Sequence, residues 1–160
     1  MSLFGDRNYQ YRDTYFVLFN RIHRPSETKL KAILHELGSK FETSELRHSD
    51  GHVESLTLID PQDYSAMDIA YVEGDDVTSQ IDEIREEFRA ITVRGEDVDK
   101  LKRLKDFDAR FDIFHFEQVV DEAEGDDEEY VDPGGLLLVM EKLVQLCHGV
   151  GYDPQSQSLI

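Results

Sequence analysis

Apolar residues follow a spacing of three and four positions in four stretches of the chain. This spacing places them on one face of a helix, so it predicts four helices. The stripes are Leu30, Ile33, Leu34 and Leu37; Ile81, Ile84, Phe88 and Ile91; Val98, Leu101 and Leu104; and most of residues 134–149. Ser26 suits the N-cap of the first helix, and Gly38 and Gly149 are expected to end the first and the last.

Runs of aromatic and β-branched residues predict the strands of a sheet. The expected strands cover residues 13–20, 41–48, 52–59, 67–74 and 110–120, with a short last strand from residue 150. The order is therefore β-α-β-β-β-α-α-β-α-β. This order predicts an α+β fold, a two-layer sandwich with a mostly antiparallel sheet and helices packed on one face. It resembles an elaborated ferredoxin-like (split β-α-β) plan, a likeness of architecture that specifies no function.

The turn at residues 49–51, with the sequence SDG, admits two geometries. A three-residue loop with its glycine in the left-handed region places His48 opposite His52. A two-residue turn instead pairs Arg47 with Glu54, a favourable match of opposite charges. The choice of turn therefore decides whether the two imidazoles face each other.

Length and composition predict one folded domain over residues 1–160. Hydrophobic residues make up 39% of the chain, with nine Phe and seven Tyr, which suffices for a single core. The hydrophilic character comes from charged residues rather than from a lack of apolar ones. Disorder of the whole chain is therefore excluded.

The net charge of −18 is concentrated in the last third of the chain. Residues 111–160 hold 12 acidic residues against one lysine, and eight of the residues in 121–132 are acidic. We expect residues 121–132 to form a solvated, mobile loop. Nucleic acids and anionic membranes attract Lys and Arg, so this charge argues against both as partners.

The single cysteine, Cys147, lies in an apolar helical run and is expected to be buried. One cysteine cannot form an internal disulfide or a multi-thiolate zinc site. The first residues lack the pattern of a secretory leader, and the longest apolar run is too short to span a bilayer. These features predict a soluble cytoplasmic protein without a bound cofactor.

His48 and His52 form the most compact candidate for chemistry in the sequence. Neutral imidazoles suit zinc and similar ions, and Asp50 or Glu54 supplies a carboxylate. The spacing equals that of the two histidines in HExxH, but that motif needs a helix and a glutamate at its second position. An exposed hairpin without metal is the favoured interpretation, and a metal site of His48, His52 and Glu54 is the alternative.

His115 is the candidate for a general base. It lies two residues before Glu117 in a predicted strand, so both side chains share one face. A carboxylate beside an imidazole can orient it for proton transfer. A histidine hydrogen-bonded within the sheet is the more common arrangement. The sequence also has no glycine-rich phosphate loop, GxGxxG motif or GxSxG nucleophile turn.

The sequence therefore favours a non-catalytic, acidic protein-interaction or regulatory domain. We expect the acidic stretch to meet a basic protein partner. The candidate contacts are Asp126, Asp127, Glu128 and Glu129. A homodimer is a further expectation, because an uncovered sheet face or edge needs protection. The alternative, from another class, is a small metal-assisted hydrolase that uses His48 and His52.

Overall fold

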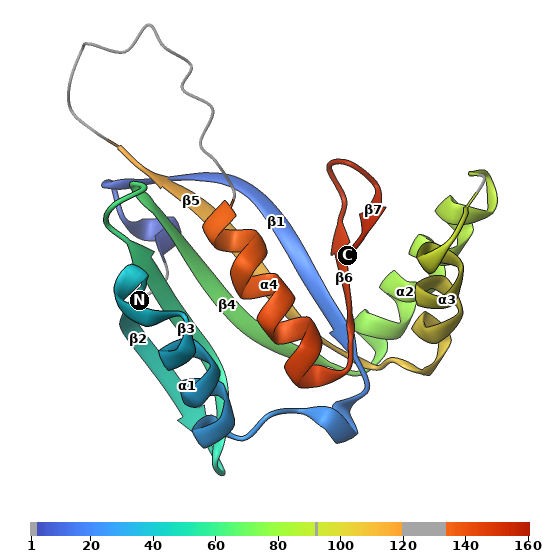
Figure 1. Ribbon diagram of the computed structural model, residues 1–160, viewed down its shortest axis with the longest axis horizontal. Coiled ribbons are helices and arrows are strands. Elements are labelled where there is room, and N and C mark those ends of the chain that lie inside the picture. Colours follow the sequence, from blue (N-terminus) through green and yellow to red (C-terminus); the bar gives the residue numbers. More distant parts are fainter. Residues whose placement is uncertain (1–2, 92, 120–133) are drawn as a thin grey trace, which may run out of the picture.

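Seven strands form one sheet in the order β2-β3-β4-β5-β1-β6-β7 (Figure 1). The computed structural model describes residues 3–91, 93–119 and 134–160. The strands are β1 (Tyr9–Phe19), β2 (Glu42–Ser49), β3 (His52–Asp60), β4 (Ser65–Glu73), β5 (Ala109–Gln118), β6 (Val150–Asp153) and β7 (Ser158–Leu159). Each neighbouring pair is antiparallel, which confirms the predicted type of sheet.

Within the described ranges, four α-helices accompany the strands. They are α1 (Glu27–Glu36), α2 (Asp75–Arg89), α3 (Glu96–Arg103) and α4 (Gly134–Cys147). A short 3-10 turn, η1 (Leu3–Gly5), precedes β1. The predicted N-cap of α1 is confirmed, because the Ser26 hydroxyl accepts a hydrogen bond from the Lys29 amide at 3.2 Å. None of the described helices is long and apolar enough to cross a membrane.

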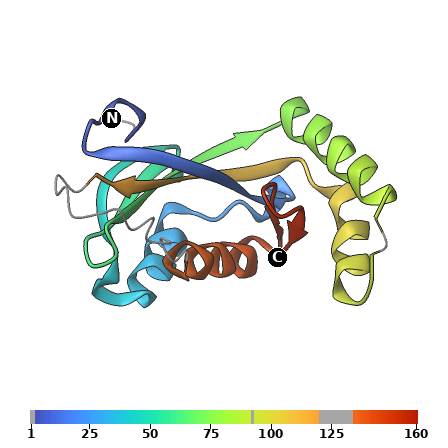
Figure 2. The ribbon, with the colours of Figure 1, turned by 90° about the horizontal axis from the view of Figure 1, so that it is seen from above.

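Two helices, α1 and α4, cover one face of the sheet, which we name the helix-covered face (Figure 2). Successive strand residues point to opposite faces, and Val17 and Phe19 point to this one. They belong to a cluster with Leu30 of α1 and with Met140 and Leu143 of α4, all nearly inaccessible to water. Burial of this apolar surface is the main stabilising contribution between the two layers.

The opposite face, which we name the open face, is covered by described residues at its two ends (Figure 2). At one end Leu18 of β1 packs with Ile81 and Ile84 of α2. At the other end Leu3 of η1 packs on Ala66 of β4. Between α2 and η1, no described helix lies over the strands.

The α+β class is confirmed, whereas α2 departs from the prediction that the helices share one face. The cause is β1, in which the consecutive residues Val17, Leu18 and Phe19 are all fully buried. A strand that is apolar on both sides needs cover on both faces of the sheet. The unbroken apolar run in this strand is the feature of the sequence that indicates cover on the second face of the sheet as well.

One helix, α4, joins β5 to β6, and these two strands pair with β1 from its two sides. The connection is therefore a split β-α-β unit around β1. The last strand, β7, pairs with β6 and was not predicted. The acidic stretch 121–132 lies between β5 and α4 in the sequence and outside the described residues.

Candidate binding groove on the open sheet face

The N-terminal turn η1 is held against the open face by an apolar contact and a hydrogen bond. Leu3 is buried with Ala66 and Phe116. Its amide donates a hydrogen bond to Oδ2 of Asp68 at 2.8 Å. Oδ1 of the same carboxylate accepts a hydrogen bond from the Thr57 hydroxyl at 2.6 Å. Because these bonds are buried and involve a carboxylate, they fix the turn over β3 and β4.

Four aromatic rings cluster beside η1. The Phe4 ring is edge-on to Phe114 and Phe116, with centroid distances of 5.2 and 4.9 Å, and lies 5.4 Å from Tyr11. Such tilted arrangements are favourable for aromatic pairs. Phe4 is nevertheless 57% exposed and Tyr11 43% exposed. Aromatic side chains are enriched in protein interfaces, so this exposed pair marks the surface as a candidate contact.

The strand register aligns four residues of the open face in one row. Glu45 of β2 lies opposite Thr57 of β3, which lies opposite Asp68 of β4. Asp68 in turn lies opposite Phe114 of β5. Directly opposed residues share a face and have Cβ atoms about 4.5–5.5 Å apart. The row therefore sets two carboxylates, a hydroxyl and an aromatic ring side by side.

Two cavities open along this row. The smaller has a volume of about 280 Å³, and its lining includes Phe4, Glu45, Arg47, Thr57, Asp68 and Phe114. The larger has a volume of about 700 Å³, and its lining includes Leu3, Asp6, Arg7, Tyr9, Glu45 and Thr57. Glu45 and Thr57 line both cavities, so the two cavities are neighbours on the open face. We name the combined depression the acidic groove.

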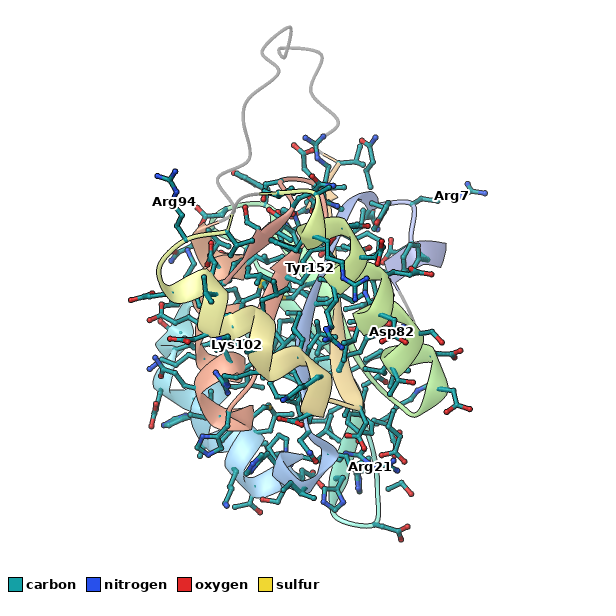
Figure 3. All side chains as sticks on the ribbon, turned by 90° about the vertical axis from the view of Figure 1, so that its right-hand side faces the viewer. Arg7, Arg21, Asp82, Arg94, Lys102 and Tyr152 are labelled. Atoms are coloured by element: carbon teal, nitrogen blue, oxygen red, sulfur yellow. The ribbon has the colours of Figure 1, made fainter. Side chains whose placement is uncertain are left out.

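Carboxylates dominate the charge of the acidic groove. Asp68 is 9% exposed and lies at its floor, and Asp6 and Glu45 line its two cavities. Two arginines also belong to the lining, Arg47 in the smaller cavity and Arg7 in the larger. Arg47 lines the smaller cavity, whereas Arg7 points away from the molecule (Figure 3). The charged groups that face the groove are therefore three carboxylates and one guanidinium, which leaves a negative net charge.

The Tyr9 phenol, in the larger cavity, responds to this negative charge. Its pKa is raised above the usual value, first by burial and then by the charges of Asp6 and Glu42. A nearby negative charge disfavours the phenolate for the same reason that it disfavours any bound anion. The acidic groove is therefore suited to a cationic ligand.

The hairpin that carries the predicted metal ligands has the two-residue turn. Asp50 and Gly51 both have positive φ, +51° and +78°, as the tight turn of a two-residue hairpin requires. A bulge follows the turn, so Arg47 lies opposite Ser55 and not opposite Glu54, the partner expected for this turn. The sequence offered the correct turn as one of two alternatives but did not reveal the bulge.

The predicted metal ligands are not brought together by this hairpin. His48 and His52 lie on opposite faces of it in the observed register. Nδ1 of His48 lies 3.4 Å from a carboxylate oxygen of Glu27, and Glu54 pairs with Arg24 at 3.2 Å. Over the described ranges, no three His, Cys, Asp or Glu side chains are placed to hold a metal ion. The metal site stays a prediction that this geometry does not favour.

His115 has a carboxylate partner, but it is a different one from the predicted Glu117. Nδ1 of His115 lies 3.0 Å from Oδ1 of Asp13, directly across from it on β1. Glu117 pairs with Arg12 at 3.1 Å. His115 is 4% exposed and lies on the helix-covered face, away from the acidic groove. A role for His115 as general base stays a prediction, and its surroundings are those of a hydrogen-bonded histidine within the sheet.

The predicted partner contacts lie outside the described residues. They are Asp126, Asp127, Glu128 and Glu129. Gln118, the last residue of β5, lines the larger cavity. The acidic stretch that begins at Asp121 therefore follows in the sequence directly from the rim of the acidic groove.

No protein-family model, curated protein or solved structure matches the chain. A functional proposal for it therefore depends on the chemistry of the acidic groove.

Proposed function

We propose that the chain is a non-catalytic cytoplasmic module that binds a basic protein partner through the acidic groove. The observation that supports this best is the row formed by Glu45, Thr57, Asp68 and Phe114, next to the exposed ring of Phe4. Carboxylates and aromatic faces are the two groups that attract Lys and Arg side chains.

The dimensions of the acidic groove fit a segment of a protein. Its two cavities, of about 280 and 700 Å³, are neighbours that share the lining residues Glu45 and Thr57. Cavities of about 300–1,000 Å³ are the usual size of ligand sites, so the groove offers more room than one side chain requires. Exposed aromatic rings beside a polar rim are also the composition of a typical protein interface.

The acidic stretch 121–132 adds eight negatively charged side chains to the chain, and its sequence follows shortly after Gln118, which lines the groove. Charges of one sign attract an oppositely charged protein over a distance of about 8 Å at physiological salt. They act mainly on the rate and selectivity of the encounter. In this proposal the stretch attracts the basic partner, and the acidic groove provides the specific contacts.

Three finer predictions belong to the same proposal. A homodimer is supported by β2, an edge strand with seven exposed residues to which a second chain can add a strand. A ferredoxin-like plan is supported by the single split unit of β5, α4 and β6. A reducing cytoplasmic location is supported by the buried free thiol of Cys147.

A peptide of alternating lysine and glycine should bind the protein, and its affinity should fall as salt rises. We expect the Kd to increase roughly tenfold between about 0.05 and 0.3 M sodium chloride, because screening weakens attraction between surface charges. Fluorescence anisotropy of a labelled peptide measures this dependence. A peptide of alternating glutamate and glycine is the matched control.

Neutralising the acidic stretch tests its attraction of the partner separately from the contacts that the acidic groove provides. The variant replaces Asp126 and Asp127 by Asn, and Glu128 and Glu129 by Gln. It should bind the lysine peptide more weakly but should still bind it. Equal binding of the lysine and glutamate peptides would contradict the proposed function. So would an affinity for the lysine peptide that is independent of salt.

A further inference from the structure

We infer that two copies of the chain pair through the outer edge of β2, so that their sheets join across a twofold axis. In this pairing Glu42 of each copy lies opposite Arg47 of the other, and Thr43 lies opposite Leu46. The interface rests on the homodimer included in the proposed function, and it does not require the acidic groove to bind a partner.

Strand β2 forms one edge of the sheet, whereas the opposite edge is the two-residue strand β7 (Figure 1). Among the described residues, no strand pairs with β2 on its outer side. The outer row of backbone N–H and C=O groups of an edge strand is a template for another strand. β2 has eight residues, seven of them exposed, so it is as long as an ordinary interior strand.

A bulge in β2 sets two opposite charges on the same face. The register with β3 skips Ser44, which is therefore the extra residue of the bulge. The β3 partners of Glu42 and Arg47 are Ile59 and Ser55, which are four positions apart and share a face. Glu42 and Arg47 therefore share the open face although they are five positions apart in the sequence.

Two identical antiparallel strands match each other in this register. When Glu42 of one copy lies opposite Arg47 of the other, Thr43 lies opposite Leu46, and each pair occurs twice. Opposed residues must share a face, and Thr43 and Leu46 share the helix-covered face. Charged residues often keep sheet edges apart, but opposite charges that face each other directly stabilise a pair of strands.

A cavity of about 390 Å³ lies between α1 and β2 on the helix-covered face. Its lining includes Leu34, Phe41, Thr43, Leu46 and Leu58. Because Thr43 and Leu46 of the two copies face each other, the cavity of each copy adjoins an apolar side chain of the other. Leu46 is half-buried in one chain, so its cover by a second chain adds apolar burial to the backbone hydrogen bonds.

The charge of this region favours a second copy as the partner of the edge. Residues 27–49, which include α1 and β2, contain four acidic and four basic residues, although the whole chain has a net charge of −18. A copy that approaches at this edge therefore meets no net repulsion from the surface that it touches. A strand of a different protein is the competing occupant, and it would leave the purified chain monomeric.

Sedimentation velocity over a concentration series measures the association of the full chain. We expect a species of twice the chain mass, whose fraction rises with protein concentration. Arg47→Glu and Glu42→Arg should each raise the Kd of the dimer at least about tenfold, because each turns two attractive charge pairs into two repulsive ones. The double variant restores opposite charges, so its Kd should return to within about threefold of the parent value.

Matched controls make the same charge changes away from β2. They are Arg94→Glu, in the link between α2 and α3, and Glu83→Arg, in α2. Both residues are exposed, and these helices lie on the opposite side of the sheet from β2 (Figure 1). Neither control should change the Kd of the dimer more than about threefold, because a distant surface charge acts only through screened repulsion.

Cysteine cross-linking reports the register directly. A mixture of Thr43→Cys and Leu46→Cys should form a disulfide between the copies, since opposed strand residues have Cα atoms about 4.5–5.5 Å apart. The native thiol, Cys147, is buried and does not compete. If Leu46→Cys alone cross-links as fast as the mixture, the twofold axis passes through this residue and the inferred register is wrong.

The outcomes separate the β2 interface from binding by the acidic groove. A chain that is monomeric at about 0.5 mM would overturn the interface, and so would a dimer that neither single charge reversal weakens. A double variant that stays as weak as the single variants would overturn the pairing of Glu42 with Arg47. If the chain is monomeric but binds the lysine-glycine peptide, the interface fails and binding by the acidic groove stands. If the dimer forms through β2 but the peptide does not bind, the acidic groove fails and the interface stands.

Discussion

Gly149→Ala should lower the free energy of unfolding by about 3 kcal/mol, because the added methyl group has no space. Gly149 links α4 to β6 and passes close to β1. A Cβ atom at this position would overlap the backbone carbonyl oxygen of Leu18 and lie 3.1 Å from Cβ of Phe19. Backbone cannot rotate out of the way as a side chain can, so β1 and the end of α4 must separate.

The neighbouring positions provide matched controls. Gly151→Ala should cost less than Gly149→Ala, about 1–2 kcal/mol, because its new methyl would lie 3.0 Å from Cβ of Ile160 and 3.1 Å from the end of the Met140 side chain and would not overlap backbone atoms. His148→Gly should change stability by less than about 1 kcal/mol, since the relief of its positive φ of +51° is offset by greater freedom of the unfolded chain.

Thermal unfolding followed by circular dichroism measures these three effects. At this chain length, about 3 kcal/mol corresponds to a fall in Tm of roughly 6–12 °C. A Tm of Gly149→Ala within about 2 °C of the parent protein would contradict the close approach of this backbone to β1.

The Cys147 thiol should react with a disulfide reagent on the order of a thousandfold more slowly in the native protein than in the unfolded chain. Burial in the apolar cluster under α4 raises the pKa of this thiol to about 12. Only the thiolate is nucleophilic, and at about pH 8 such a group is almost entirely protonated. The side chain is also fully inaccessible to the reagent.

The rate of reaction with an aromatic disulfide, followed by absorbance with and without guanidinium chloride, tests this expectation. The chain has one cysteine, so the signal reports on Cys147 and on no other thiol. Rapid stoichiometric labelling of the native protein would show that α4 does not bury this position.

The periodicity of apolar residues was sufficient to predict most helices and strands. It did not predict how closely these elements approach one another. Gly149 was predicted to end α4 because glycine tolerates a positive φ. In the structure His148 takes the positive φ, and Gly149 is needed because β1 passes beside it. A spacing pattern describes one element at a time, whereas this contact arises between two elements.

The acidic groove was not predicted because its residues are distant in the sequence. Glu45, Asp68 and Phe114 come from three strands, and only the register brings them into one row. Phe4 comes from η1, a three-residue turn that is too short to show an apolar periodicity. The histidines of the SDG hairpin are close in the sequence, yet the two-residue turn places them on opposite faces.

Zero-length cross-linking tests most directly whether the acidic groove is the contact surface. A carbodiimide joins a carboxylate to an amine that touches it, without a spacer. Mixed with the lysine-glycine peptide, the protein should form cross-links at Glu45 and Asp6, and high salt should remove them. Cross-links confined to the exposed acids of α2, such as Asp82 and Glu86, would contradict the assignment of the partner surface to the open face.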